Sequence, residues 1–197
     1  MFKLLLPLPK QICVALSGGV DSVAIVDFLS KNHDVSCAFY HHGTENSEAA
    51  CEFVSQFCTD RNIPLFVGML NKDKDKKLSD EEFWRNERYR FLESIHMPMV
   101  TGHNLNDCVE TYLWSCLHGK PKVIPATRNN IVRPFLTTKK QVFIDWCNRK
   151  NIAWCEDKSN ANLKYTRNYI RHTMLPNALV VNPGLFNVVK RIVEKQI

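Results

Sequence analysis

A turn between a strand and a helix near the N-terminus constrains the fold more than any other feature of this chain. Residues 12–16 form an apolar run typical of a buried strand, and residues 23–29 are typical of a helix. Between them lies Ser-Gly-Gly-Val-Asp-Ser, residues 17–22, whose glycine pair lets the backbone approach a ligand closely. The helix N-terminus behind the turn offers unpaired N–H groups and the positive end of a dipole. The turn therefore predicts a phosphate-binding loop.

The side chains of this loop suit a nucleotide. Ser17 and Ser22 add hydroxyl donors, and Asp21 is a candidate ligand for a Mg²⁺ ion that neutralises phosphate charge. The loop is not a Walker A motif, because the Gly-Lys-Ser/Thr ending is absent. It resembles the PP-loop of the N-type ATP pyrophosphatases, and this resemblance implies ATP as a substrate. The predicted ATP contacts are Ser17, Gly18, Gly19, Val20, Asp21 and Ser22, together with His41 at the end of the next strand.

The rest of the chain alternates strand and helix patterns. This alternation predicts an α/β fold with a parallel sheet, right-handed crossovers and ligands at the carboxyl ends of the strands. Thr138 is expected to cap the last long helix, and Ser79 with Glu82 forms a capping box. Residues 71–77 are expected to form a charged loop. A turn is expected at 129–130, before residues 131–133. The expected strands are 12–16, 35–40, 64–68 and 99–101, and the expected helices are 23–29, 46–61, 79–93, 105–117 and 138–150.

Length and composition limit the class of protein. A chain of 197 residues forms one domain or one domain with a small addition, and no apolar run is long enough to span a bilayer. The hydrophobic N-terminus is interrupted by prolines and is interpreted as a lead-in to the first strand rather than a signal peptide. Eight cysteines without any C-x-x-C pair are typical of reduced thiols. We therefore expect a cytoplasmic protein without a membrane partner.

Charge is distributed unevenly along the chain. Residues 1–98 hold 11 Lys and Arg against 14 Asp and Glu, whereas residues 99–197 hold 15 against 6. A basic half beside a nucleotide loop is consistent with a second polyanion such as RNA. A solvated basic surface without a partner explains the charge equally well.

Several polar clusters follow the predicted strands. The segment from His103 to Thr111 enters a helix on which Asp107 and Glu110 share a face. Capping alone could explain Asp107, but Glu110 lies deeper among apolar residues and needs a partner such as a basic side chain or a metal-bound water. Paired guanidinium groups suit phosphate or carboxylate, although a solvated helix face explains them too. Such arginine pairs on one predicted face are Arg85 with Arg88 and Arg167 with Arg171.

Taken in order, these motifs resemble the catalytic domain of the tRNA(Ile)-lysidine synthetases over residues 11–183. Three positions depart from the family pattern: Asn104, where the family usually has a second histidine, Cys108, where it usually has Gln, and His118, where it has Arg. Many members carry further C-terminal domains that bind tRNA, and we expect this chain to lack them. The matching residues are Arg85, Arg88 and Tyr89; Gly102, His103, Asp107, Glu110 and Thr111; Arg133 to Leu136; Trp154, Asp157, Ser159 and Asn160; and Arg167, Asn168 and Arg171.

The resemblance implies a Rossmann-like, adenine nucleotide alpha hydrolase-like parallel sheet flanked by helices, with a short helical C-terminal extension. Residues 1–137 would form the ATP-binding catalytic part, and residues 138–197 a helical part that completes it and contacts tRNA. The implied reaction adenylates the wobble cytidine of a tRNA(Ile) with a CAU anticodon and then joins L-lysine to it. The implied catalytic residues are Asp21, Arg85, His103, Asp107 and Glu110, and the implied tRNA contacts are Arg88, Arg133, Asp157, Asn160, Arg167 and Arg171.

Two other functions compete with this one. A sulfur transferase of the 2-thiocytidine type has the same loop, but it needs paired cysteines for an iron–sulfur cluster. A non-catalytic nucleotide- or RNA-binding module is the second alternative, and the intact loop with Asp21 argues against it. Nothing in the sequence decides the oligomeric state, so a homodimer remains open.

Overall fold

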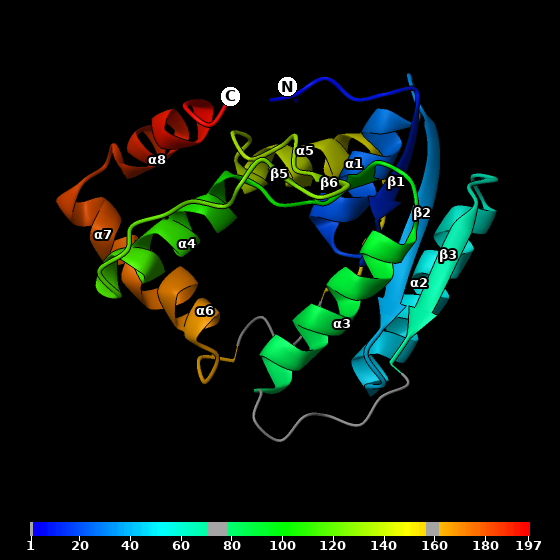
Figure 1. Cartoon of the computed structure of the whole chain (residues 1–197), viewed down its shortest axis with the longest axis horizontal. Coiled ribbons are helices and arrows are strands. Elements are labelled where there is room, and N and C mark those ends of the chain that lie inside the picture. The colour runs from blue at the N-terminus through cyan, green and yellow to red at the C-terminus, as the bar shows by residue number, and fades with distance from the viewer. Residues whose placement is uncertain (1, 71–78, 157–161) are drawn as a thin grey trace.

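A six-stranded sheet organises the chain, in the spatial order β3-β2-β1-β4-β6-β5 (Figure 1). The computed structural model describes residues 2–70, 79–156 and 162–197. All neighbouring strands are parallel except β5, which pairs antiparallel with β6 at one edge. The strands are β1 (Gln11–Ala15), β2 (Asp34–His41), β3 (Leu65–Met69), β4 (Met99–Val100), β5 (Thr127–Arg128) and β6 (Ile131–Val132).

Helices cover both faces of this sheet. Alternate residues of a strand point to opposite faces, so Ile12 and Val14 pack with α1, α2 and α5 in one cluster, while Cys13 packs with α3 in another. Helix α1 has buried residues on all sides because it lies between the sheet and α5. The helices of this part are α1 (Val20–Leu29), α2 (Glu45–Thr59), α3 (Asp80–Ser94), α4 (Leu105–Leu117) and α5 (Lys140–Lys150).

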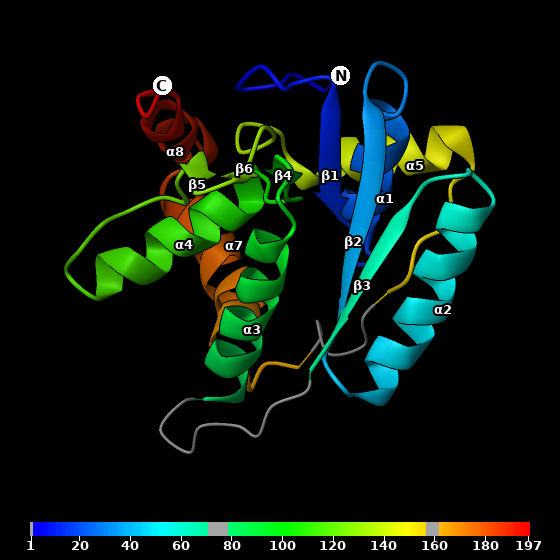
Figure 2. The same ribbon diagram turned by 45° about the vertical axis from the view of Figure 1, so that its right-hand side comes forward.

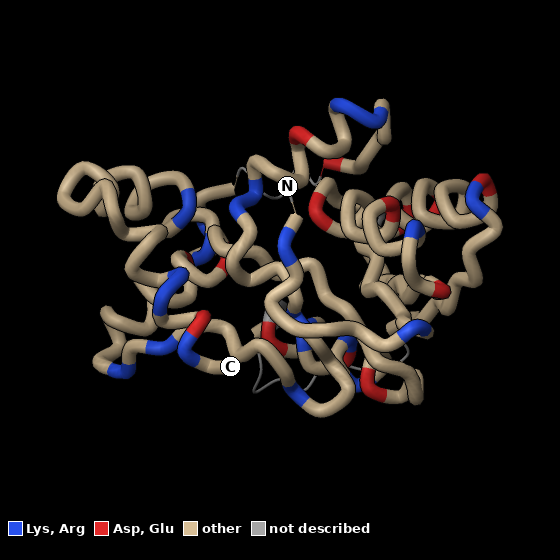
Figure 3. The backbone as a smooth tube through the Cα atoms, turned by 90° about the horizontal axis from the view of Figure 1, so that it is seen from above, with Lys and Arg blue, Asp and Glu red and all other residues tan. Residues whose placement is uncertain are grey.

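The C-terminal segment packs against α4 beside the sheet, as Figure 2 shows. Helix α8 (Leu185–Glu194) places Leu185, Val189 and Val193 four residues apart on one buried stripe, which contacts α4. It is preceded by α6 (Thr166–Tyr169), a π-helical turn over Ile170–Met174 and α7 (Leu175–Val181). In Figure 3, the left side of the molecule, which holds the C-terminal segment, has more Lys and Arg positions (blue) than Asp and Glu positions (red).

The expected α/β fold with a parallel sheet and a helical C-terminal extension is confirmed. The helix expected over 105–117 has these bounds, and Ser79 accepts a hydrogen bond from the Glu82 N–H at the start of α3. The expected cap at Thr138 is wrong: α5 begins after Lys139, and the Thr138 carbonyl accepts from the Leu105 N–H instead. Strand β5 was not expected, because two exposed polar residues carry no strand pattern.

The proposed division at residue 138 stays a prediction. Residues Phe143 and Cys147 of α5 belong to the same buried cluster as β1 and α1, so this helix shares the core of the sheet. The charged loop expected over 71–77 lies outside the described residues. No helix in the described part of the chain has the length and apolar content of a membrane span.

Candidate active site at the carboxyl ends of the strands

The predicted phosphate loop joins β1 to α1. Gly18 has a φ of +82°, a backbone conformation that favours glycine, and Gly19 is the N-cap of α1 without a side-chain cap. The Ser22 hydroxyl accepts from the Ser17 N–H at 3.2 Å and donates to the Gly19 carbonyl at 2.8 Å. The Cys155 N–H donates to the Gly18 carbonyl at 2.9 Å. These bonds hold the loop in place and leave the first N–H groups of α1 without side-chain partners for an anion.

Asp21, in the first turn of α1, has a buried carboxylate that is half satisfied. Its Oδ2 accepts from the Asn104 amide at 3.2 Å, and its buried Oδ1 has no hydrogen-bond partner among the described residues. Burial is the main cause that raises the pKa of Asp21 to about 7, and the charge of Asp107 raises it further against the opposing effects of Lys140 and Arg171. An orphaned carboxylate oxygen at a phosphate loop fits a hard divalent cation such as Mg²⁺.

Asn104 is a site residue that the motif comparison treated only as a departure from the family pattern. Its Oδ1 caps α4 by accepting from the N–H groups of Asn106 and Asp107, and the Asn104 N–H donates to the Asp107 carboxylate at 2.9 Å. The remaining amide N–H of Asn104 is the one that reaches Asp21. An N-cap asparagine before an acidic third residue is a local capping signal that could have found it.

Two carboxylates and two arginines form a four-residue ion cluster between α4 and the C-terminal segment. Glu110, with a side chain only 2% exposed, accepts from Arg171 at 2.7 and 3.1 Å and from Arg167 at 3.0 Å. Asp107 accepts from Arg167 at 2.7 Å and lies 3.7 Å from Arg171. The basic partner expected for Glu110 is therefore present. The cluster places both signs of charge beside Asp21.

A second group of arginines surrounds the buried phenol of Tyr89. The guanidinium groups of Arg85, Arg88 and Arg128 lie 4.9, 5.6 and 4.9 Å from its ring centre, and Arg133 donates to its hydroxyl at 3.2 Å. Burial alone would raise the pKa of Tyr89, but the Arg133 hydrogen bond and the arginine charges outweigh it and lower the pKa. In the described part of the chain, no carboxylate forms an ion pair with Arg85, Arg88 or Arg133. This group, the Tyr89 arginines, suits an anion.

Arg133 itself is only 2% exposed. It donates to the Pro125 carbonyl at 2.9 Å as well as to Tyr89, and its Nε has no partner among the described residues. Its placement is thus interior, where it organises the Tyr89 arginines. Its expected contact with tRNA stays a prediction.

Two histidines face these arginines. Burial, followed by the charges of Arg133 and Arg167, holds the pKa of His103 well below its usual range. Burial and the charge of Arg88 lower the pKa of His42 to about 4. His103 exchanges a hydrogen bond with the Thr101 hydroxyl at 2.9 Å through Nδ1. Both imidazoles are therefore neutral at pH 7, and His103 presents Nε2 without a positive charge.

His41 has its ring nitrogens engaged locally. Its Nδ1 accepts from the Gly43 N–H at 3.0 Å and its Nε2 donates to Glu48 at 3.2 Å, which is the arrangement of a capped strand end. Its expected ATP contact remains a prediction. Asp157 and Asn160 lie outside the described residues. All eight cysteines are unpaired, and the described residues contain no group of three His, Cys, Asp or Glu that could hold a metal ion.

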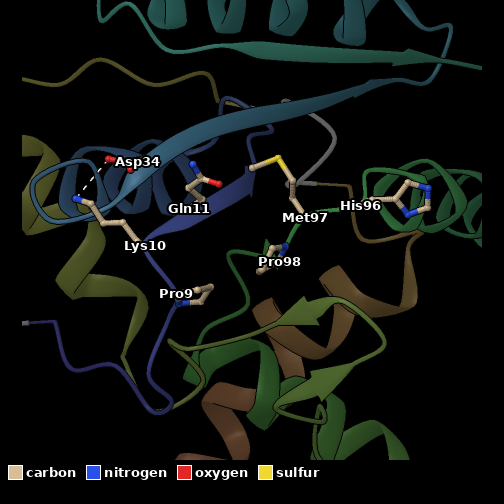
Figure 4. A pocket seen from close by; sticks show the side chains of 7 residues that line it. All are labelled: Pro9, Lys10, Gln11, Asp34, His96, Met97 and Pro98. Atoms are coloured by element: carbon tan, nitrogen blue, oxygen red, sulfur yellow. Dashed lines mark ion pairs between the residues drawn. The ribbon is translucent and has the colours of Figure 1, made fainter.

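An open pocket of about 470 Å³ lies at the amino ends of the strands, opposite the phosphate loop (Figure 4). Lys10, Gln11 and Asp34 line it where β1 and β2 begin, and Pro98 lies before β4. The phosphate loop, His103 and Arg133 instead follow the carboxyl ends of β1, β4 and β6. Since ligands of parallel α/β sheets bind at the carboxyl ends, the candidate site is the polar cluster and not this pocket.

A family model described as the PP-loop domain matches residues 4–178 of the chain. The chain belongs to the PP-loop domain family. This match agrees with the loop over residues 17–22 and with the observed sheet, and it assigns the chain an ATP-binding domain.

Curated relatives of this PP-loop domain share a name. Proteins named tRNA(Ile)-lysidine synthase from Pseudothermotoga lettingae and Thermosipho africanus are each 32% identical to it, over 92% and 93% of the chain. One from Haemophilus ducreyi is 31% identical over 94% of the chain. The matches cover 45%, 47% and 46% of those proteins, so the chain spans about half the length of the curated relatives it matches.

Solved structures confirm the fold. An NH3-dependent NAD synthetase from Campylobacter jejuni has a TM-score of 0.54 at 14% identity, covering 96% of this chain and 86% of its own. An NMN synthetase from Francisella tularensis has a TM-score of 0.51 at 13% identity, covering 95% of this chain and 86% of its own. The PP-loop domain therefore has the mostly parallel, helix-flanked sheet of these synthetases.

Proposed function

We propose that this PP-loop domain ligates L-lysine to C2 of the wobble cytidine in a tRNA(Ile) with a CAU anticodon, at the expense of ATP. The similarity to proteins named tRNA(Ile)-lysidine synthase supports the substrate class. The observation that carries the proposal is the cluster of Asp107, Glu110, Arg167 and Arg171 beside the phosphate loop. The α-carbon of lysine carries one ammonium and one carboxylate group, and the carboxylates and guanidinium groups of this cluster have the charges to bind them.

The first step activates the cytidine. Its C2 oxygen attacks the α-phosphorus of ATP, the bond to the bridging oxygen breaks, and pyrophosphate leaves. Backbone N–H groups at Gly19 and the start of α1 would hold the departing phosphates. The Tyr89 arginines would hold a phosphate group of the RNA or the nucleotide, and neutral His103 would line the reacting centre.

The second step replaces AMP by lysine. The lysine side-chain amine attacks C2, the bond from C2 to the adenylated oxygen breaks, and AMP leaves while the nitrogen loses a proton. Asp107 or Glu110 would fix the free ammonium group of the amino acid, and Arg167 or Arg171 its carboxylate. Correct placement of the amine beside C2 is the contribution that these charges make to the rate.

Asp21 would hold Mg²⁺ through its free Oδ1, since a buried carboxylate oxygen without a partner suits that ion. When bound, the ion neutralises charge that develops on pyrophosphate. A cytoplasmic location follows from the tRNA substrate. No described feature favours the sulfur-transfer alternative.

Mass spectrometry of nucleosides tests the proposal. The protein is incubated with a CAU-anticodon tRNA(Ile), ATP and lysine, and we expect lysidine together with AMP. Omission of lysine should leave AMP attached to the tRNA. Asp21→Ala should abolish AMP formation. Asp145→Ala, which removes an exposed carboxylate of α5, is the control and should leave AMP formation unchanged. Absence of lysidine from the complete reaction contradicts the proposal.

A further inference from the structure

The outer end of α4 carries an exposed aromatic pair. Trp114, with 39% of its surface exposed, stacks on His118 with ring centres 4.2 Å apart and an interplanar angle of 29°. His118 Nδ1 donates to the Trp114 carbonyl at 2.8 Å, so Nε2 faces outward as an acceptor. Lys122 lies 5.9 Å from the Trp114 ring centre. The stacked rings of Trp114 and His118, which we call the plate, therefore lie at the surface beside the positive charge of Lys122.

This plate is not part of the core. The apolar face of α4 consists of Val109, Tyr112 and Leu113, which pack with α8. Trp114 and His118 share a face, because they are four positions apart, and at about 100° per residue that face points away from Val109. Figure 2 shows the end of α4 projecting away from the sheet.

The plate is held in a fixed position by the turn that follows it. The buried Ser115 hydroxyl accepts from the Lys122 N–H at 2.9 Å and donates to the carbonyls of Tyr112 and Lys122. The Lys120 N–H donates to the Ser115 carbonyl at 3.1 Å. Pinning the turn to the helix fixes the backbone of both lysines, keeps Lys122 beside the Trp114 ring and reduces the entropy lost on binding.

The plate also lies on a direct line from the ion cluster. Asp107, Glu110, Trp114 and His118 follow each other on one stripe of α4. At 1.5 Å per residue, Trp114 and His118 lie about 6 and 12 Å beyond Glu110 along the helix. Stacked nucleotides are spaced by about 3.4 Å, so these distances correspond to about two to four nucleotides.

The positive charge of the residues around the plate indicates a negatively charged partner. No Asp or Glu occurs between Glu110 and Asp145 in the sequence, whereas this stretch contains Lys120, Lys122 and several further basic residues. Exposed aromatics among basic residues bind the faces of unpaired bases. We propose that Trp114 and His118, with Lys120 and Lys122, form a platform on which an unpaired base of the substrate RNA stacks; this rests on the proposed function. The base lies in the same single-stranded loop as the reacting nucleotide.

Binding of a labelled CAU anticodon stem-loop, measured by fluorescence anisotropy, tests the platform. Loss of one stacked base costs about 1–3 kcal/mol, so Trp114→Ala should weaken binding about 5- to 150-fold. Trp114→Phe keeps an aromatic face and should stay within about threefold of the original. Leu117→Ala is the matched control, because Leu117 is 67% exposed on the same helix end and should leave binding unchanged.

A blunt duplex of the same stem separates base stacking from charge. Trp114→Ala should change duplex binding by less than about threefold, because every base pair except the two at the ends is stacked on both faces. His118→Ala removes an exposed ring and should weaken loop binding at least about threefold, which keeps the test valid if Trp114→Ala fails to fold.

The platform is refuted if Trp114→Ala or, where that variant is unfolded, His118→Ala binds the loop as the original does. It is also refuted if Leu117→Ala loses as much affinity, or if the original protein does not bind the loop. Lysidine formation is measured separately. Loop binding that depends on Trp114 without any lysidine contradicts the proposed function alone.

Discussion

The ion cluster between α4 and the C-terminal segment makes a sharp stability prediction. Arg171→Met keeps much of the side-chain volume but removes the guanidinium that gives Glu110 two of its hydrogen bonds. Loss of one partner of a buried ion pair costs about 3–5 kcal/mol, because the other charge stays buried. Arg167 still holds Glu110 and Asp107, so we expect the free energy of unfolding to fall by about 2–3 kcal/mol.

The double variant decides between an orphaned charge and a simple loss of contacts. Glu110→Gln removes the charge that Arg171→Met leaves behind, and a neutral amide costs less to bury. We therefore expect the double variant to be more stable than Arg171→Met by about 1 kcal/mol or more, although it lacks more native groups.

Urea unfolding followed by circular dichroism measures these differences. Lys190→Met is the matched control, because Lys190 pairs with Glu194 at 3.9 Å on an exposed surface. Exposed pairs contribute little, so this variant should stay within about 0.5–1 kcal/mol of the original. The interpretation of the ion cluster is wrong if Arg171→Met is as mild as the control, or if the double variant is less stable than Arg171→Met.

Three further predictions concern the loop, its carboxylate and the Tyr89 arginines. Gly18→Ala should cost about 1–2 kcal/mol and weaken ATP binding in calorimetry, because Gly18 has a φ of +82°. The raised pKa of Asp21 means that stability present below about pH 4 is lost as the pH rises through 7. In EDTA, Asp21→Asn should therefore lose less stability than the original between pH 5 and 8, by up to about 3 kcal/mol, and equal losses would contradict this. Tyr89→Phe removes one acceptor of the buried Arg133 and leaves it the Pro125 carbonyl, which should cost about 1–3 kcal/mol in urea unfolding, whereas no change would show that the bond is dispensable.

Local patterns made part of the site predictable from sequence. The phosphate loop and α4 were both predicted because glycine pairs, capping residues and helical spacing act within a few residues. The pairing of Glu110 with Arg167 and Arg171 joins positions 57 and 61 residues apart, and no local pattern encodes such a contact. The spacing of the two arginines indicated a shared face, but it could not indicate that carboxylates cover it.

The placement of Arg133 was hidden for a related reason. An arginine after a short strand is usually exposed, whereas this one is interior because Tyr89 and the Pro125 carbonyl accept from its guanidinium. Charged residues are buried when such partners are arranged around them, and those partners come from α3 and from the loop before β5. Arg85, Arg88 and Arg133 could be proposed as site residues from the sequence, but their shared contact with Tyr89 could not be predicted from it.

Asn104 connects the two halves of the candidate site. Its carbonyl oxygen accepts from the start of α4, and its amide nitrogen donates to Asp21, so one side chain fixes the carboxylate of the phosphate loop relative to Asp107. The histidine expected here from the family pattern also has one acceptor and one donor nitrogen when neutral. A protonated imidazole loses its acceptor, whereas an amide keeps both roles at every pH. The Asn104 amide therefore holds its end of the link between Asp21 and the ion cluster at every pH, whereas the raised pKa of Asp21, about 7, makes the other end sensitive to pH.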